Sequence, residues 1–503
     1  MAANAETLEP LNRFPRMVHN HCLSQVIKAE RRGLARKNAL KTKADALAYV
    51  ADVQKKIRSC FAPFPQKKSA LKAKIVGVVE RDTYTIEKLI FESRPGFLVT
   101  ANVYLPKNRK HPLPAVVGAC GHSSNGKAAE AYQSFAQGLA RLGYICLIYD
   151  PLGQGERSQY LDEEMHLIMK GTTREHNLAG NQQILIGEFL GTWRAWDGMR
   201  ALDYLLTRND VDPKRIGVTG NSGGGTMTTW LCGVEPRWTM AAPSCFVTTW
   251  RRNMENELPQ DNEQCPPRCL ALGLDHDDFL AAMAPKPVII LPKEKDYFDV
   301  RGSIEGLGRL KKLYALLGAE ENIDLAAGPT PHGYSLENRE SMYRWFNKVT
   351  GASDAQSEPE ITIEKDETLL CTPEGQVAGL KSRTVFDFTA AKAERLAGKR
   401  VPLEGQALHE ALRAALRMPA TDGPPRVRNL RPKSPKRLYP SPFYMNYAVE
   451  TEPGIQAIVT MLTRERWNSR PPRATGGGRA ILYVSHHSAD AELRGEPALP
   501  EII

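Results

Sequence analysis

Short apolar runs that alternate with helix-like segments constrain this chain more than any other feature of its sequence. Buried parallel strands read as continuous runs of Val, Ile and Leu, and each needs a helical crossover to the next. The pattern therefore predicts a parallel sheet covered by helices on both faces. The runs are PAVVGAC (114–120), YICLIYD (144–150), RIGVTG (215–220), PVIILP (287–292) and NIDLAAG (322–328), and the helical segments include 130–143, 185–208, 304–318 and 336–349.

Two segments with different sequence patterns precede these alternating strands and helices. Residues 17–60 have helical spacing and are rich in Lys and Arg, which favours a solvated helix face over a site for a polyanion. The runs TYTIEKLIFES and FLVTANVYLP are broken by Arg94-Pro95-Gly96, which predicts two antiparallel strands joined by a turn.

The end of the chain repeats part of its beginning. Glu92-Ser-Arg-Pro-Gly96 recurs as Glu450-Thr-Glu-Pro-Gly454, and the segment 114–125 lies in the same order against 479–490. Two echoes in register predict a second copy of the same fold that starts near residue 440. We therefore expect a helical N-terminal segment (1–82), a catalytic domain (83–350), a linker with a short helical region (351–440) and an incomplete second domain (441–503).

Composition excludes several functions. The formal net charge of +10 over 503 residues is too diffuse to predict nucleic-acid binding. The longest apolar runs fall short of the roughly 18 residues that a membrane-spanning helix needs, and the first residues carry no apolar signal core. The compartment stays open between secreted or periplasmic, with a signal peptide absent from this sequence, and cytoplasmic. The 9 scattered cysteines do not form a disulfide framework. Oligomeric state cannot be read from these patterns.

One short motif carries the chemistry. Gly220-Asn221-Ser222-Gly223-Gly224 fits G-x-S-x-G, between an apolar strand and a helix-compatible segment. This strand–turn–helix context raises a serine hydroxyl above the sheet edge, while small neighbours allow close backbone approach. A phosphate loop is disfavoured because no Gly-Lys-Ser/Thr follows. The sequence predicts Ser222 as a nucleophile.

A nucleophilic serine needs a base, and the base needs an orienting acid. His332 follows the last predicted strand, on the loop where the base of such a site belongs. The acid should follow the preceding strand, where Asp296 and Asp299 both qualify. We expect Asp296, the first to leave the strand, and keep Asp299 as the alternative.

The remaining site residues follow from the same geometry. A tetrahedral oxyanion needs two backbone donors. We expect the Gly223 amide and the Ser123 amide, with His122 as the alternative to Ser123. Trp250, Glu156 and Arg157 follow predicted strands and are candidates for substrate contact, because open α/β sheets bind ligands beyond the carboxyl ends of their strands.

These residues together resemble serine esterases of the α/β-hydrolase superfamily, and most closely the acetyl xylan esterase-like branch of carbohydrate esterases. The resemblance covers roughly residues 83–350 and includes the hairpin ESRPGFLVTANVYLP. It implies an α/β-hydrolase fold that deacetylates plant polysaccharide or oligosaccharide without a metal or other cofactor. The first oxyanion loop reads GHSSNG and departs from the usual HGG-type sequence. The repeated end resembles the second, partial module of tandem hydrolase-like proteins.

Other functions remain open at this point. Within enzymes they are a glucuronoyl esterase, a dienelactone hydrolase-like enzyme and a prolyl-oligopeptidase-type peptidase. A buried Arg near Ser222 would favour the glucuronoyl esterase, because that enzyme must hold a uronate. The alternative from another class is a binding module without catalysis.

Overall fold

The computed structural model describes residues 13–418, 423–431, 437–467, 480–486, 488–495 and 497–502. These residues form two compact units. The larger unit is residues 26–400, and the smaller contains the described residues up to 25 and from 401 onward. Each unit is described by itself.

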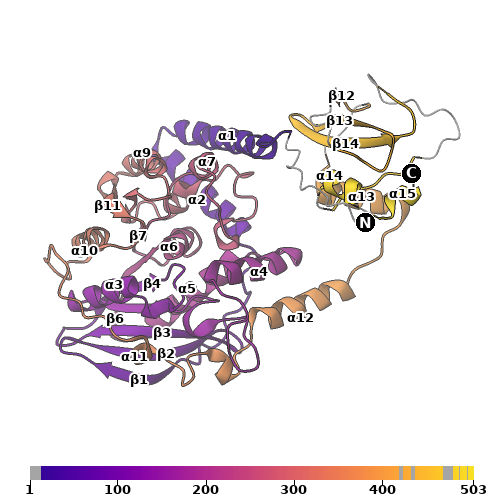
Figure 1. Cartoon of the computed structure of the whole chain (residues 1–503). Helices are drawn as coiled ribbons and strands as arrows, with labels where there is room; N and C mark the ends of the chain where they lie inside the picture. The colour runs from indigo at the N-terminus through magenta and orange to yellow at the C-terminus, as the bar shows by residue number, and fades with distance from the viewer. Residues whose placement is uncertain are drawn as a thin grey trace. The chain divides into compact units, whose positions relative to one another are not determined.

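A nine-stranded sheet forms the centre of the larger unit, in the order β1-β2-β3-β5-β4-β6-β7-β8-β10 (Figure 1). The strands from β5 to β10 are parallel, whereas β1, β2 and β3 run antiparallel to their neighbours. The predicted α/β architecture is therefore confirmed. The strands are β1 (Lys74–Glu80), β2 (Tyr84–Arg94), β3 (Phe97–Pro106), β4 (Leu113–Ala119), β5 (Ile145–Tyr149), β6 (Val211–Asn221), β7 (Met240–Ser244), β8 (Val288–Ile290) and β10 (Ile323–Leu325).

Helices cover both faces of this sheet. Successive strand residues point to opposite faces, so Val117 packs into one apolar cluster and Val116 into the other. The first cluster contains side chains of α2, α5, α6, α8 and α9, and the second contains those of α3 and α10. The helices are α1 (Met17–Asn38), α2 (Lys43–Cys60), α3 (Glu130–Arg141), α5 (Leu190–Leu206), α6 (Gly223–Val234), α8 (His276–Ala281), α9 (Val300–Leu317) and α10 (Leu336–Thr350).

Residues 351–400 lie within the larger unit, although the sequence predicts a linker there. Gln133 and Gln137 of α3 exchange hydrogen bonds with the main chain of Glu364 and Thr362, which fixes this segment against the helix. The linker prediction fails here because polar side chains on α3 hold the backbone of this segment. Such contacts leave no apolar periodicity in the sequence. The segment continues into α11 (Asp366–Leu369) and α12 (Val385–Gly398). β1 also forms inside the region predicted to be helical.

The smaller unit contains a three-stranded antiparallel sheet of β12 (Val427–Leu430), β13 (Phe443–Glu452) and β14 (Ile455–Thr463). Its hairpin β13-β14 has the same construction as β2-β3. The Glu92 carboxylate accepts from the Gly96 amide at 3.0 Å, and Glu450 accepts from Gly454 at 3.4 Å. Both glycines have a positive φ, 72° and 84°. The first echoed segment therefore forms the same kind of hairpin in both places. The helices of this unit are α13 (Gly405–Leu416), α14 (Ala489–Gly495) and α15 (Leu499–Ile502).

The second echo does not fold as predicted. Residues 480–485 form no strand, and Ile481, Leu482 and Val484 are exposed. A strand needs pairing partners, and the described part of this unit supplies none beside that segment. The amides of His486 and Ser488, which align with Gly121 and Ser123 in the echo, donate to the Glu492 carboxylate of α14. His487 lies outside the described residues.

Two other expectations can be checked directly. No helix among the described residues combines the length and apolar character that crossing a bilayer requires. All nine cysteines of the chain fall within the described residues, and each is an unpaired thiol.

Candidate active site

Ser222 occupies a strained turn between β6 and α6. Its φ of 59° and ψ of −121° are unfavourable for a residue with a Cβ, and its amide donates to the Ser244 carbonyl at 3.0 Å. The flanking glycines are required sterically, because a Cβ at Gly220 or Gly224 would lie within 2.4 Å or 2.1 Å of the Ala119 carbonyl oxygen. This is the geometry of a nucleophile elbow.

His332 and Asp296 come together beyond the ends of two short strands, β9 (Lys293–Lys295) and β11 (Gly328–Pro331). Both Asp296 oxygens lie 2.9 Å from His332 Nδ1, and the Asp296 side chain is buried. A carboxylate only accepts, so Nδ1 carries the proton and Nε2 is the basic nitrogen.

Asp299, the alternative acid, faces elsewhere. Its carboxylate pairs with Arg301 and caps α9. The hydrogen bond from Arg301 holds the pKa of Asp299 well below its usual range. The structure therefore brings Asp296, and not Asp299, to the imidazole.

Tyr297 is a site residue that the sequence did not reveal. Its hydroxyl lies 2.9 Å from His332 Nε2, and its ring stacks on the imidazole with centroids 4.3 Å apart. Burial raises the pKa of the Tyr297 phenol, and a hydrogen bond with the Ser222 side chain opposes that shift. Within the described residues Ser222 and His332 share no direct hydrogen bond, and the Tyr297 hydroxyl contacts both. The only sequence signal was its position next to Asp296.

The oxyanion donors differ in part from the prediction. Gly223 is the first residue of α6, where helix amides have no intrahelical acceptor. The Ser123 amide donates to the Gly121 carbonyl at 2.9 Å, so the predicted second donor is already engaged. The His122 amide has no acceptor within the part of the chain that the structure describes. A Cβ at Gly121 would lie 3.1 Å from Ser222 Cβ, which places this loop against the elbow. The geometry favours the alternative donor, His122.

Glu156 and Arg157 are not substrate contacts. Their side chains are 1% and 0% exposed. Glu156 pairs with Lys127, and Arg157 pairs with Asp197. The prediction is wrong because both charges are satisfied inside the protein by residues far away in sequence.

Trp250 does not form a sugar platform either. It begins α7 (Trp250–Glu255), where its ring packs edge-on against His276 at 4.2 Å and stacks on Trp230 at 6.4 Å. Trp230 and His276 are themselves fully buried. The ring therefore covers the core, and the substrate-contact prediction for Trp250 is not supported.

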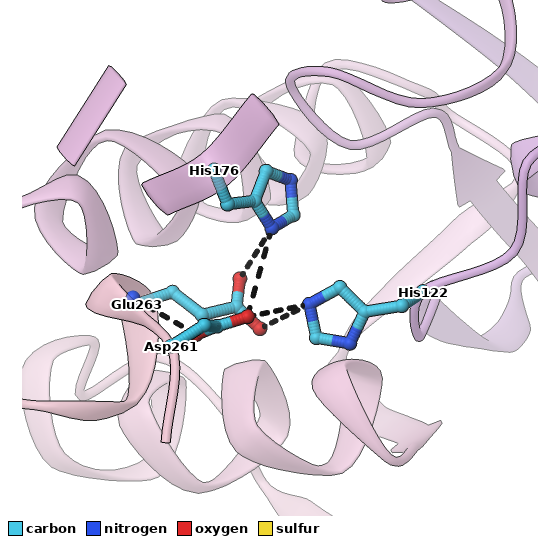
Figure 2. A group of neighbouring side chains, drawn as sticks. All are labelled: His122, His176, Asp261 and Glu263. Carbon is cyan, nitrogen blue, oxygen red and sulfur yellow. Dashed lines mark hydrogen bonds and ion pairs between the residues drawn. The ribbon is translucent and has the colours of Figure 1, made fainter. Parts of the chain in front are cut away.

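Figure 2 shows a second group of polar side chains. This group lies beside the elbow, because a Cβ at Gly223 would be 3.0 Å from Glu263 Oε1. His122 Nε2 is 2.9 Å from Asp261 and 3.2 Å from Glu263, and both acids belong to the turn around η3 (Asn262–Gln264). His176, on α4 (Thr172–Leu185), has Nδ1 3.7 Å from Glu263. Two imidazoles and two carboxylates form a donor set of the kind that binds zinc. Arg194 of α5 also pairs with Glu263. No sequence pattern indicates this cluster, because its members come from three separate segments.

Comparisons with known proteins indicate an esterase. Residues 71–263 match the family described as acetyl xylan esterase (AXE1). This part of the chain is similar to acetyl xylan esterases. The match contains Ser222 and the cluster beside it and ends before Asp296 and His332. The family places the chain among the carboxylic ester hydrolases.

Individual relatives of this esterase are distant. “Putative hydrolase YtaP” of Bacillus subtilis (strain 168) is 25% identical over 286 residues, which is 54% of this chain and 90% of that protein. The solved structure “Methylesterase BT1017” has a TM-score of 0.59 and 23% identity, covering 74% of this chain and 81% of that one. The structural likeness shows the α/β-hydrolase fold.

Proposed function

We propose that the larger unit hydrolyses acetyl esters of plant polysaccharide or oligosaccharide through an acyl-enzyme on Ser222. The observation that carries this proposal is the strained Ser222 turn beside the His332–Asp296 pair. The match to acetyl xylan esterases indicates that the bond cleaved is an ester, and the polysaccharide substrate is inferred from the name of that family.

The residues support a two-step acyl transfer. His332 Nε2 takes the Ser222 proton as Oγ bonds to the ester carbonyl carbon, and the amides of Gly223 and His122 stabilise the oxyanion. The imidazolium returns this proton to the departing sugar oxygen as the C–O bond breaks. Water, deprotonated by the same nitrogen, then releases acetate and frees Ser222. Asp296 stays ionised and stabilises the imidazolium. The Tyr297 hydroxyl must leave Nε2 for this direct transfer.

A uronate ester is the alternative substrate. Its carboxyl group is the ester that is cleaved, so it becomes a carboxylate only in the product. The buried guanidinium of Arg194 near this loop pairs with Glu263 and donates to the Cys120 carbonyl at 3.3 Å. Its charge is therefore already matched, and it gives no reason to prefer the uronate ester over the acetyl ester.

Turnover of a small chromogenic acetate ester tests the reaction. Ser222→Ala should lower kcat by about 10⁴-fold or more without unfolding the protein. Ser134→Ala, which removes a hydroxyl that only bonds within α3, is the matched control and should keep full activity. A phosphonate reagent should label Ser222. Retained turnover in Ser222→Ala, or labelling elsewhere, would remove the assignment.

Substrate class needs a panel. Acetylated xylan and acetylated oligosaccharide should be turned over faster than methyl-esterified pectin, methyl glucuronoyl esters and a peptide amide. Faster turnover of either uronate ester would replace the acetyl-ester proposal, while leaving the Ser222 mechanism intact.

A further inference from the structure

The cluster beside the elbow has a role in catalysis that rests on the proposed function. We propose that Asp261 and Glu263 are positioning residues that hold His122 so that its amide completes a preformed oxyanion site with Gly223.

The His122 ring is held from two directions. Its Nε2 faces the two carboxylates at 2.9 Å and 3.2 Å, so this nitrogen carries a hydrogen (Figure 2). The other side of the ring lies on the elbow, because a Cβ at Gly223 would be 2.8 Å from His122 Cε1. A side chain at position 223 would displace the His122 ring or the Glu263 carboxylate, so the ring lies directly against the start of α6.

The main chain around His122 is also fixed. The Gly121 amide donates to the Tyr132 hydroxyl at 2.6 Å, and the Gly121 carbonyl accepts from Gln154 at 2.6 Å. Arg194 holds the Cys120 carbonyl. The neighbouring peptide groups are thus committed to the protein, and the His122 amide is left for a ligand. Preorganised donors of this kind stabilise charge without reorganising during the reaction.

The two carboxylates belong to a turn that is hydrogen-bonded to α6, the helix that begins with Gly223. Asp261 caps η3 in a reciprocal pair with Gln264, and Gln264 donates to Thr226 of α6 at 3.2 Å. The Glu263 carbonyl accepts from Trp230 of α6 at 2.9 Å. A movement of η3 relative to α6 would break these bonds, so the amides of His122 and Gly223 keep a constant separation.

The same side chains could hold a metal ion, but the positive charge of Arg194 opposes its binding. The His176 Nε2–H donates to the Leu152 carbonyl, which leaves Nδ1 bare, and burial lowers the pKa of His176 to about 4. Bare imidazole nitrogens anchored in this way are common in metal sites. Here the Arg194 guanidinium already lies on Glu263 and would repel a divalent ion. Burial raises the pKa of Asp261, but His122 and His176 together outweigh burial and hold it well below its usual range. Asp261 is therefore the ionised partner of His122.

Steady-state kinetics on a small acetate ester test the proposal. Asp261→Asn weakens the anchor, and His122→Ala removes it while keeping the amide. Both should lower kcat by up to about 100- to 1000-fold, the cost of losing one oxyanion donor, with KM changed less than about threefold. Phosphonate labelling of Ser222 should slow in parallel. Asp275→Asn is the control, since Asp275 is another buried capping-box acid, on α8, and it should keep kcat.

A double-mutant cycle gives the discriminating result. His122→Ala with Asp261→Asn should be no slower than His122→Ala alone within about twofold, because the two changes remove one anchor. Additive losses, an effect confined to KM, or unchanged kcat in Asp261→Asn would overturn the proposal. So would a stoichiometric transition metal in the purified protein that Asp261→Asn loses. If Asp261→Asn keeps kcat while Ser222→Ala is inactive, only this inference is overturned. If Ser222→Ala is active, the proposed function is overturned.

Discussion

Asp296→Asn is the substitution whose effect the structure defines most sharply. Both carboxylate oxygens contact His332 Nδ1 at 2.9 Å, and the side chain is fully buried. Asn keeps the shape but replaces one oxygen with an NH₂ donor. The imidazole can then accept at Nδ1, which moves its proton to Nε2, the nitrogen that must receive the Ser222 proton.

The expected loss follows from the two functions that disappear. The wrong tautomer removes the base in part of the molecules, and a neutral amide no longer stabilises the imidazolium. The equivalent exchange in a serine protease triad costs about 10⁴-fold in kcat. That factor is about 5.5 kcal/mol of transition-state stabilisation. Solvent does not screen the pair, because Asp296 is inaccessible.

The assay is kcat on a small acetate ester, with Asp299→Asn as the matched control. Asp299 contacts the exposed Arg301, and such a surface pair contributes little to stability. Asn also caps a helix well, so Asp299→Asn should fold and keep kcat. Full activity in Asp296→Asn would refute the assigned acid. Loss confined to Asp299→Asn would transfer the role to Asp299.

The other predictions concern Tyr297, Glu175 and the repeated end. Tyr297→Phe frees His332 Nε2, so kcat should stay within a few-fold of wild type or rise. A loss above about 100-fold would mean that the proton travels through the hydroxyl. Burial raises the pKa of Glu175 to about 7, so the folded protein keeps a proton that the unfolded chain releases above pH 4.5. The stabilisation that this retained proton gives to the folded state is complete below pH 4.5 and is lost as the pH rises through 7. Glu175→Gln should therefore raise Tm relative to wild type at pH 8 and not at pH 4, and an equal Tm at pH 8 would contradict the shift. Deleting residues 441–503 should change kcat on a small ester less than about fivefold, and an inactive but folded deletion would show that this end supplies part of the site.

The sequence predicts what depends on local pattern. The parallel strands follow from apolar runs, and Ser222 and His332 follow from their positions after such runs. Asp296 could be preferred over Asp299 because the first acid beyond a strand lies nearest the sheet edge. These inferences need no knowledge of how side chains pack.

The errors concern contacts between distant segments. Glu156 and Arg157 look like cleft residues until Lys127 and Asp197 are seen to neutralise them inside the protein. Ser123 was preferred because nothing in the sequence shows that its amide turns back to Gly121. Tyr297 was missed because a phenol beside an imidazole depends on the path of one loop. The strand predicted at 479–485 failed because pairing depends on neighbours that sequence pattern cannot supply.

The glutamate that closes each hairpin has a consequence for how such a chain can evolve. The residues that determine such a hairpin lie within about 20 positions of one another, and isolated hairpins form within microseconds. A repeated stretch of this kind can therefore adopt its shape independently of the segments that follow it. β14 borders the small sheet among the described residues, and an open strand edge offers amides and carbonyls to any extended peptide. A repeated hairpin could therefore acquire a new partner strand without any change in its turn.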